Sequence, residues 1–141
     1  MRKRYIWALV LAGAVFLGWR YGYQAALKYF FRLSGTVTLS ETLAGSRPGA
    51  NSMLFVVARN ERGVPVAVTK IINPVFPAPF ELTSASLIMP DVLTRSVYLE
   101  ALLNTHGQLG VFKKGDLRGE RRDRDHFISK DLEITLSERE K

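Results

Sequence analysis

The segment that most constrains this chain is residues 5–19, because its fifteen side chains carry no charge. Arg2, Lys3 and Arg4 precede it, and Arg20 follows it. A helix buried in a soluble protein would need a polar face, and this segment has none. It therefore predicts a transmembrane helix, in which the expected anchor residues are Tyr5, Ile6, Trp7, Leu9, Leu11, Val15, Phe16, Leu17 and Trp19.

The segment could act as a cleaved signal peptide or as an uncleaved signal anchor. The small residues "LAGA" (11–14) lie inside the apolar core, and "YQAA" (23–26) has a bulky aromatic nearby, so both are poor cleavage sites. We therefore expect an anchor. Fifteen helical residues span about 22 Å, less than a hydrocarbon core of roughly 30 Å, so the helix should continue to Leu27. The leading basic cluster favours a cytoplasmic N-terminus and a periplasmic C-terminal part, in the inner membrane of a bacterium.

The net charge of +7 is concentrated in this N-terminal segment. Six of the 20 basic side chains lie in residues 1–32, which contain no acid, and residues 33–141 carry 14 basic and 13 acidic side chains. A nucleic-acid surface needs basic charge clustered on the folded domain itself. The charge pattern therefore argues against a nucleic-acid partner and for a lipid bilayer.

The residues that could perform chemistry are few. The chain has no cysteine, which excludes disulfides, thiolate metal sites and covalent haem attachment. His106 and His126 are far apart in sequence, show no metal-ligand spacing and lie in predicted loops, where we expect both to be solvated. The sequence therefore predicts no catalytic residue, cofactor or metal ligand, and an exported enzyme is the least favoured alternative.

After residue 32 the pattern changes to that of β-strands. Leu33, Gly35, Val37 and Leu39 alternate with polar residues, and "MLFVVAR" (53–59) is a continuous apolar run, as expected for a strand covered on both faces. Further strands are expected at 64–72, 80–83, 96–104 and 131–136, with a short strand or an extended piece at 109–112, separated by turn residues that include Gly45, Pro48, Gly49 and Asn51. About seven short strands predict an all-β, immunoglobulin-like β-sandwich, with a small barrel as the alternative.

The expected organisation has three parts. Residues 1–32 form a basic cytoplasmic tail and membrane anchor, residues 33–137 form the sandwich, and residues 138–141 form a frayed tail. Residues 84–95 could be a helical turn or a loop. The run 113–124 mixes basic and acidic side chains, so it is expected to be a loop, either simply solvated or used to dock a charged partner or lipid headgroups.

Candidate partner-binding residues lie in segments with loop character. Apolar side chains there either close the open end of the sandwich or form an exposed patch for a partner. The residues proposed for this role are Phe76, Phe80, Ile88, Met89, Asp116 and Arg118.

Several stretches resemble, in order, the C-terminal periplasmic domain of the cytochrome c-type biogenesis proteins CcmI (CycH). The most specific are the opening G-x-V-x-L strand with "LAG" (35–45), "LFVVAR" (54–59) and "GDLRG" (115–119). The resemblance covers about residues 33–136. It implies an immunoglobulin-like domain and an inner-membrane protein that holds apocytochrome c, unfolded and reduced, for haem ligation.

The resemblance also implies partners and alternatives. The expected partners are apocytochrome c or other cytochrome maturation or respiratory membrane proteins, contacted as a chaperone or scaffold without catalysis. Family members carry a helical repeat domain before this one, which is credited with gripping the apocytochrome C-terminal helix, whereas here one apolar segment leads directly into the β domain. The alternative function is a structural subunit of a membrane-bound, cytochrome-containing respiratory complex.

Overall fold

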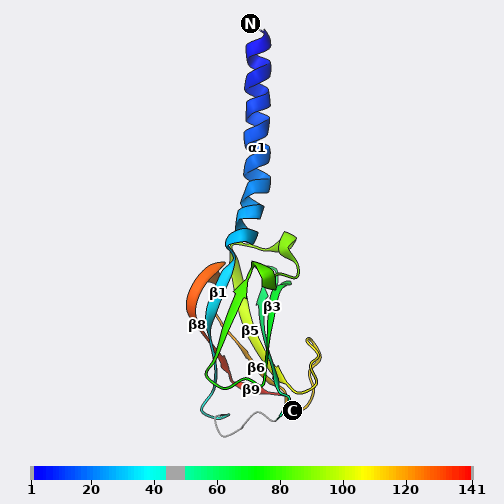
Figure 1. The fold of residues 1–141 in the computed structure, drawn as a ribbon, viewed down its shortest axis with the longest axis vertical. Helices are drawn as coiled ribbons and strands as arrows, with labels where there is room; N and C mark the ends of the chain where they lie inside the picture. Colours follow the sequence, from blue (N-terminus) through cyan, green and yellow to red (C-terminus); the bar gives the residue numbers. More distant parts are fainter. Residues whose placement is uncertain (1, 44–49, 141) are drawn as a thin grey trace.

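The computed structural model describes residues 2–43 and 50–140, and within them one long helix is followed by nine strands and two 3₁₀ turns (Figure 1). The elements are α1 (Arg2–Phe30), β1 (Arg32–Leu39), β2 (Met53–Arg59), β3 (Pro65–Ile72), β4 (Ala78–Thr83), η1 (Ser84–Ser86), η2 (Pro90–Val92), β5 (Ser96–Asn104), β6 (Leu117–Glu120), β7 (Asp125–His126), β8 (Ile128–Leu136) and β9 (Glu138–Arg139). The predicted turn residues Gly45, Pro48 and Gly49 lie outside the described residues, whereas Asn51 adopts the positive φ of 64° typical of a turn.

Helix α1 projects from one end of the β domain (Figure 1) and is long and apolar enough to cross a membrane. Residues 2–23 are all exposed, and residues 5–23 alone span about 28 Å, close to the thickness of a hydrocarbon core. The helix continues beyond the expected Leu27 and ends at Phe30. Its last turn enters the domain, where Leu27 and Phe31 are 3% and 2% exposed and belong to the hydrophobic core.

The strands form two sheets packed face to face. One sheet has the order β4-β1-β8, and the other has the order β3-β2-β5-β6-β9, with β7 pairing with the start of β5. The pair β1–β8 is parallel and the other strand pairs are antiparallel. The core between the sheets is formed by inward residues of both, among them Leu33, Val37, Val56, Leu99 and Ile134, all at most 1% exposed. The two sheets confirm the predicted sandwich.

In β1 the core-facing Leu33 and Val37 are buried as expected, whereas Gly35 and Leu39 are half-buried like the polar residues beside them. The continuous burial expected for β2 is confirmed, because its five central residues are all buried.

In β5 the sequence alternates Val97, Leu99, Ala101 and Leu103 with Tyr98, Glu100, Leu102 and Asn104, but the burial does not alternate, because Glu100, Leu102 and Asn104 are buried as well as the core-facing residues. For Leu102 and Asn104 the reason is the β5–β6 loop (105–116), which folds back over this part of the outer face of the sheet, whereas Glu100 lies beside Arg59 and Arg118. Val111 and Phe112 from this loop line a small hollow together with Leu102.

The C-terminal third contains more strand than the sequence predicts. Residues 113–126, where a loop is expected, contain β6 and β7, and residues 109–112, where a short strand or an extended piece is expected, form no strand. Gly110, with φ of 84°, interrupts that apolar stretch. The expected frayed tail forms β9, which pairs with β6, and Glu140 donates its N–H to the carbonyl oxygen of Asp116 at 2.8 Å.

Residues 84–93 confirm the helical-turn alternative, since they form η1 and η2 and pack beside α1. Gln24 Nε2 donates to the carbonyl oxygen of Leu93 at 3.1 Å, and Lys28 Nζ lies 2.7 Å from Asp91 Oδ1. Arg95 lies over the ring of Tyr23, 5.8 Å from its centroid. These contacts fasten the last two turns of α1 to the sandwich.

Two glycines allow the strands of this domain to approach closely. A Cβ on Gly35 would overlap the carbonyl oxygen of Leu132 in β8, and a Cβ on Gly119 would overlap that of Thr135. Gly35 therefore permits a close β1–β8 contact, and Gly119 permits β6 of one sheet to pack against β8 of the other. Both clashes are with backbone, which cannot rotate away as a flexible side chain could.

The variant Gly119→Ala tests this close packing. We expect it to lower the free energy of unfolding by about 1–3 kcal/mol, because the added methyl group forces the two sheets apart. Urea denaturation of the detergent-solubilised protein, followed by circular dichroism, measures the change. Gly22→Ala is the size-matched control, since it has nothing within 4 Å and adds a better helix former. Equal stability of Gly119→Ala and wild type would contradict the close packing of β6 on β8.

Candidate functional site

The apolar residues proposed to bind a partner separate into buried and exposed pairs. Phe80 is 5% exposed and belongs to the core, and Phe76 is half-buried and packs against that core. Ile88 and Met89 are 56% and 46% exposed and lie between η1 and η2, beside α1. Phe80 therefore offers little surface in this conformation, whereas Ile88 and Met89 are accessible, and a partner for any of them stays a prediction.

The two charged candidates have different surroundings. Asp116 is buried, and its Oδ2 accepts hydrogen bonds from His106 Nε2 at 2.7 Å and from the N–H of Lys113 at 2.8 Å. Arg118 is half-exposed, lies over the Phe112 ring at 5.3 Å and is 4.0 Å from Glu100. Asp116 thus organises the β5–β6 loop from within, while Arg118 covers part of the sheet's outer face.

The expectation that both histidines are solvated is wrong for His106, whose side chain is 12% exposed. Its Nδ1 accepts the N–H of Gln108 at 3.2 Å, so Nε2 carries the proton that it donates to Asp116. Both ring nitrogens are therefore used within the protein, and the pair connects the two ends of the β5–β6 loop. His126 is exposed, as expected. Among residues 2–43 and 50–140, no three His, Asp or Glu side chains are grouped to hold a metal ion.

Five exposed apolar residues that the sequence does not single out lie toward the end of the sandwich away from α1, and we call this set the distal rim. Ile72 ends β3, Val75 lies in the β3–β4 loop, and three further members come from the β5–β6 loop. Their exposed fractions are 63% for Ile72, 82% for Val75, 40% for Leu109, 44% for Val111 and 45% for Phe112. In the sequence, the apolar stretch 109–112 is the feature that could have indicated these exposed residues, but its composition is equally consistent with a buried strand.

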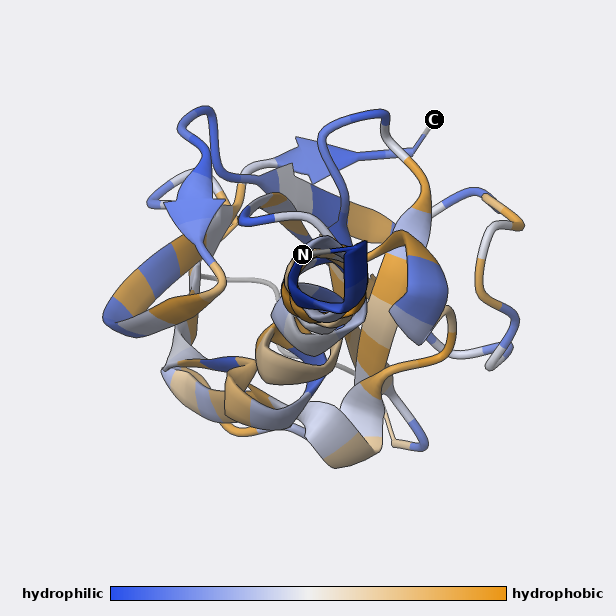
Figure 2. Ribbon diagram, turned by 90° about the horizontal axis from the view of Figure 1, so that it is seen from above, coloured by the Kyte–Doolittle hydropathy of each residue, from blue (hydrophilic) through white to orange (hydrophobic). Residues whose placement is uncertain are grey.

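A second exposed cluster, here called the collar, lies at the opposite end and consists of Ile88, Met89 and Val92. Figure 1 shows the segment around residue 90 beside the lower end of α1. Figure 2 looks along α1 onto this end, where apolar and polar stretches both lie around the helix. The collar and the distal rim therefore occupy opposite ends of the domain.

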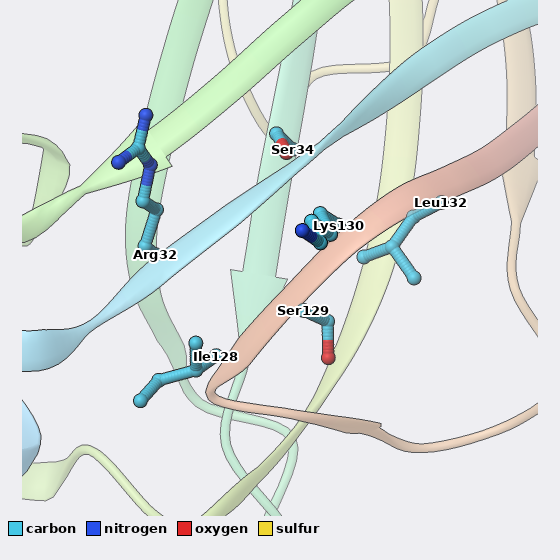
Figure 3. A pocket seen from close by; sticks show the side chains of 6 residues that line it. All are labelled: Arg32, Ser34, Ile128, Ser129, Lys130 and Leu132. Atoms are coloured by element: carbon cyan, nitrogen blue, oxygen red, sulfur yellow. The ribbon is translucent and has the colours of Figure 1, made fainter.

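A basic hollow of about 690 Å³ lies where β1 and β8 begin (Figure 3). Arg32, Ser34, Ser129 and Lys130 line it together with Ile128 and Leu132. The register of the β1–β8 pair shifts between Leu33 and Gly35, next to Asp131 with its φ of 58°, and this irregularity opens the hollow. Arg32 is held by Glu81 at 2.9 Å.

Comparisons with known proteins place these features in a family context. A family model described as the cytochrome c-type biogenesis protein H Ig-like domain matches residues 33–137. An uncharacterized protein of Aquifex aeolicus (strain VF5) is 33% identical over 89 residues, which are 62% of this chain and 59% of that protein. The match thus spans little more than half of the relative's length. No solved structure matches the chain.

The connection between His106 and Asp116 can be measured by a double-mutant cycle. We expect His106→Ala and Asp116→Ala each to lower the free energy of unfolding by about 1–3 kcal/mol, because each leaves a buried polar partner unsatisfied. The double variant should lose less than the sum, with a coupling energy of about 1 kcal/mol. Denaturant unfolding of the four proteins gives this value, and additive losses would show that the two side chains do not interact.

Proposed function

Because this chain belongs to the family of cytochrome c-type biogenesis protein H Ig-like domains, we propose that it is a membrane-anchored accessory factor of c-type cytochrome biogenesis that acts through protein contact. Its sandwich is the immunoglobulin-like domain of that family. The proposed partner is apocytochrome c or another cytochrome maturation protein. The observation that carries the proposal is the distal rim, an exposed apolar surface at the end of the domain away from α1.

The distal rim has the composition expected of a protein-binding surface. Its five side chains are aliphatic or aromatic and remain at least 40% exposed. Lys113 and Lys114 follow Phe112 directly, so cations lie beside the apolar residues. An unfolded cytochrome segment exposes apolar side chains that such a surface could cover. The His106–Asp116 pair supports the proposal because it orders the loop that carries three members of the rim.

In this proposal the membrane anchor determines on which side of the membrane the distal rim lies and how far it lies from the end of the helix. We propose that α1 crosses the inner membrane with its N-terminus in the cytoplasm, which leaves the sandwich in the periplasm. The eight residues of β1 then hold the rim about 26 Å beyond the end of the helix. At that distance the rim is accessible to a protein emerging on the same side of the membrane.

We also propose that the chain contributes binding and no catalysis of its own. In the described residues, the partly buried histidine uses both ring nitrogens in loop contacts, which leaves neither free to act as a base. The buried carboxylate of Glu100 is likewise engaged, 2.8 Å from Arg59 Nη2.

The first experiment is a gentle detergent pull-down of the tagged, full-length protein from its native membranes, with mass spectrometry of the partners. Recovery of apocytochrome or maturation proteins, together with loss of c-type cytochromes in a deletion strain, supports the proposal. Normal cytochromes in the deletion strain and no such partner in the eluate would refute it. A stoichiometric set of respiratory subunits would instead identify a structural subunit.

The orientation of the sandwich can be tested with a single introduced cysteine, because the chain has none of its own. Val75→Cys places a thiol at a position that is 82% exposed. We expect a membrane-impermeant maleimide to label it in intact spheroplasts. A cysteine at Arg2, on the proposed cytoplasmic side, should react only after lysis. The reverse pattern would contradict the proposed periplasmic location.

The distal rim can be tested by adding charge to it. We expect Val75→Glu to weaken capture of the identified partner about tenfold, because a desolvated carboxylate opposes apolar contact. Leu109→Glu should act in the same direction. Ile128→Glu, at a 49% exposed position where β8 begins beside the α1 end of the domain, adds the same charge away from the rim and is the matched control. Binding measured by biolayer interferometry that is equal in all three variants and wild type would eliminate the rim as the docking surface.

A further inference from the structure

The collar lies at a defined height along α1. Gln24 Nε2 donates to the carbonyl oxygen of Leu93 at 3.1 Å and lies 3.4 Å from those of Pro90 and Asp91. These carbonyls belong to η2 and its C-terminal end. The η2 turn is therefore level with Gln24, six residues or about 9 Å before the end of the helix.

This height coincides with the expected edge of the hydrocarbon core. Residues 5–23 of α1 span about 28 Å, close to the roughly 30 Å of a bilayer's hydrocarbon core. Gln24 is the next residue, and Arg20 can extend its side chain outward to the interface. The headgroup layer beyond that edge is about 5–7 Å thick. The collar thus falls within the headgroup layer of a bilayer that α1 crosses.

The side chains at this height suit an anionic interface. The collar presents Ile88, Met89 and Val92 at exposed fractions of 56%, 46% and 39%. Asp91 is neutralised by Lys28 at 2.7 Å. Arg95 is exposed, stacks on Tyr23 and has no carboxylate partner among the described residues. Apolar side chains flanked by an unpaired cation are the combination by which protein surfaces bind anionic membranes.

We propose that the collar inserts into the headgroup layer of the bilayer that α1 crosses, with Arg95 bound to the phosphate of an anionic phospholipid. This inference rests on the proposed membrane anchoring by α1. The sandwich then contacts the membrane at a second point beside the helix. This second contact fixes the orientation of the domain, so that the distal rim faces away from the bilayer. The β1–β8 hollow lies about 12 Å further from the hydrocarbon and is outside this contact.

The experiment uses the absence of cysteine in the full chain. Ile88→Cys and, as the distal reference, Val75→Cys are labelled with the environment-sensitive dye NBD and reconstituted in nanodiscs of equal parts phosphatidylcholine and phosphatidylglycerol. A fraction of the lipid carries a nitroxide on its headgroup. We expect the label at position 88 to lose most of its emission and to shift to the blue, and the label at position 75 to do neither.

The same discs report separately on the anchor. Trp7 and Trp19 are the chain's two tryptophans and both lie in α1, so quenching of their fluorescence by lipid with brominated acyl chains measures insertion of the helix. Quenched tryptophans with equal NBD emission at positions 88 and 75 would overturn the collar contact and leave the anchor standing. Unquenched tryptophans would overturn both the anchor and the collar contact.

The role of charge is tested in the Ile88→Cys background. We expect quenching at position 88 to fall in discs of phosphatidylcholine alone, to fall in anionic discs when Arg95→Ala is added, and to be retained with Arg95→Lys. Lys130→Ala, which removes an exposed cation of the β1–β8 hollow, is the matched control and should change nothing. Quenching that is independent of lipid charge and of Arg95 would overturn the assignment of an anionic headgroup.

Discussion

The apolar joint between α1 and the sandwich is the contact on which the rest of the structure depends. Leu27 and Phe31 are almost fully buried in the core of the domain, and β1 begins at the residue after Phe31. The helix is therefore continuous with the sandwich, without a flexible linker between them. Gln24 and Lys28 add polar contacts to the 3₁₀ turns beside the helix. Because of this joint, one end of the domain lies beside α1 and the distal rim lies at the other end.

The sandwich beyond the joint depends on close backbone packing and on paired buried charges. Gly35 and Gly119 permit contacts with the backbone of β8 that any larger residue would obstruct. The buried carboxylates each have a partner: Glu100 has Arg59, Asp116 has His106, and Asp125 has Arg121 at 2.7 Å. No buried side-chain nitrogen or oxygen in the described residues lacks a hydrogen bond. Because these polar groups keep hydrogen-bond partners when they are buried, loops can cover the outer face of the sheet with little loss of stability.

The predictions that succeeded rest on local periodicity. The alternation from Leu33 to Leu39 and the apolar run of β2 were sufficient to predict which faces are buried, because side-chain direction in a strand repeats every two residues. Gly35 and Gly119, which lie in the most specific parts of the family resemblance, are the two glycines described above whose Cβ would overlap the backbone of β8. The predictions that failed concern residues whose partners are distant in sequence. Glu138 and Arg139 form a strand only because β6 offers an edge, and the buried carboxylate of Glu100 is paired with Arg59 of another strand.

The candidate surfaces also combine features that are visible in the sequence with features that depend on contacts between distant residues. Ile88 and Met89 could be selected from the sequence as apolar residues in a loop, but their position beside α1 depends on how residues 84–93 pack. The distal rim combines residues from two loops that are far apart in sequence and lie at the same end of the folded domain. By itself the sequence determined the apolar helix, the β class and the alternating core, because each follows from charge and periodicity along a continuous stretch. Only the tertiary structure decided which apolar residues remain exposed, that His106 is engaged by Asp116, and that the helix is built into the core, because burial depends on neighbours that the chain brings together from a distance.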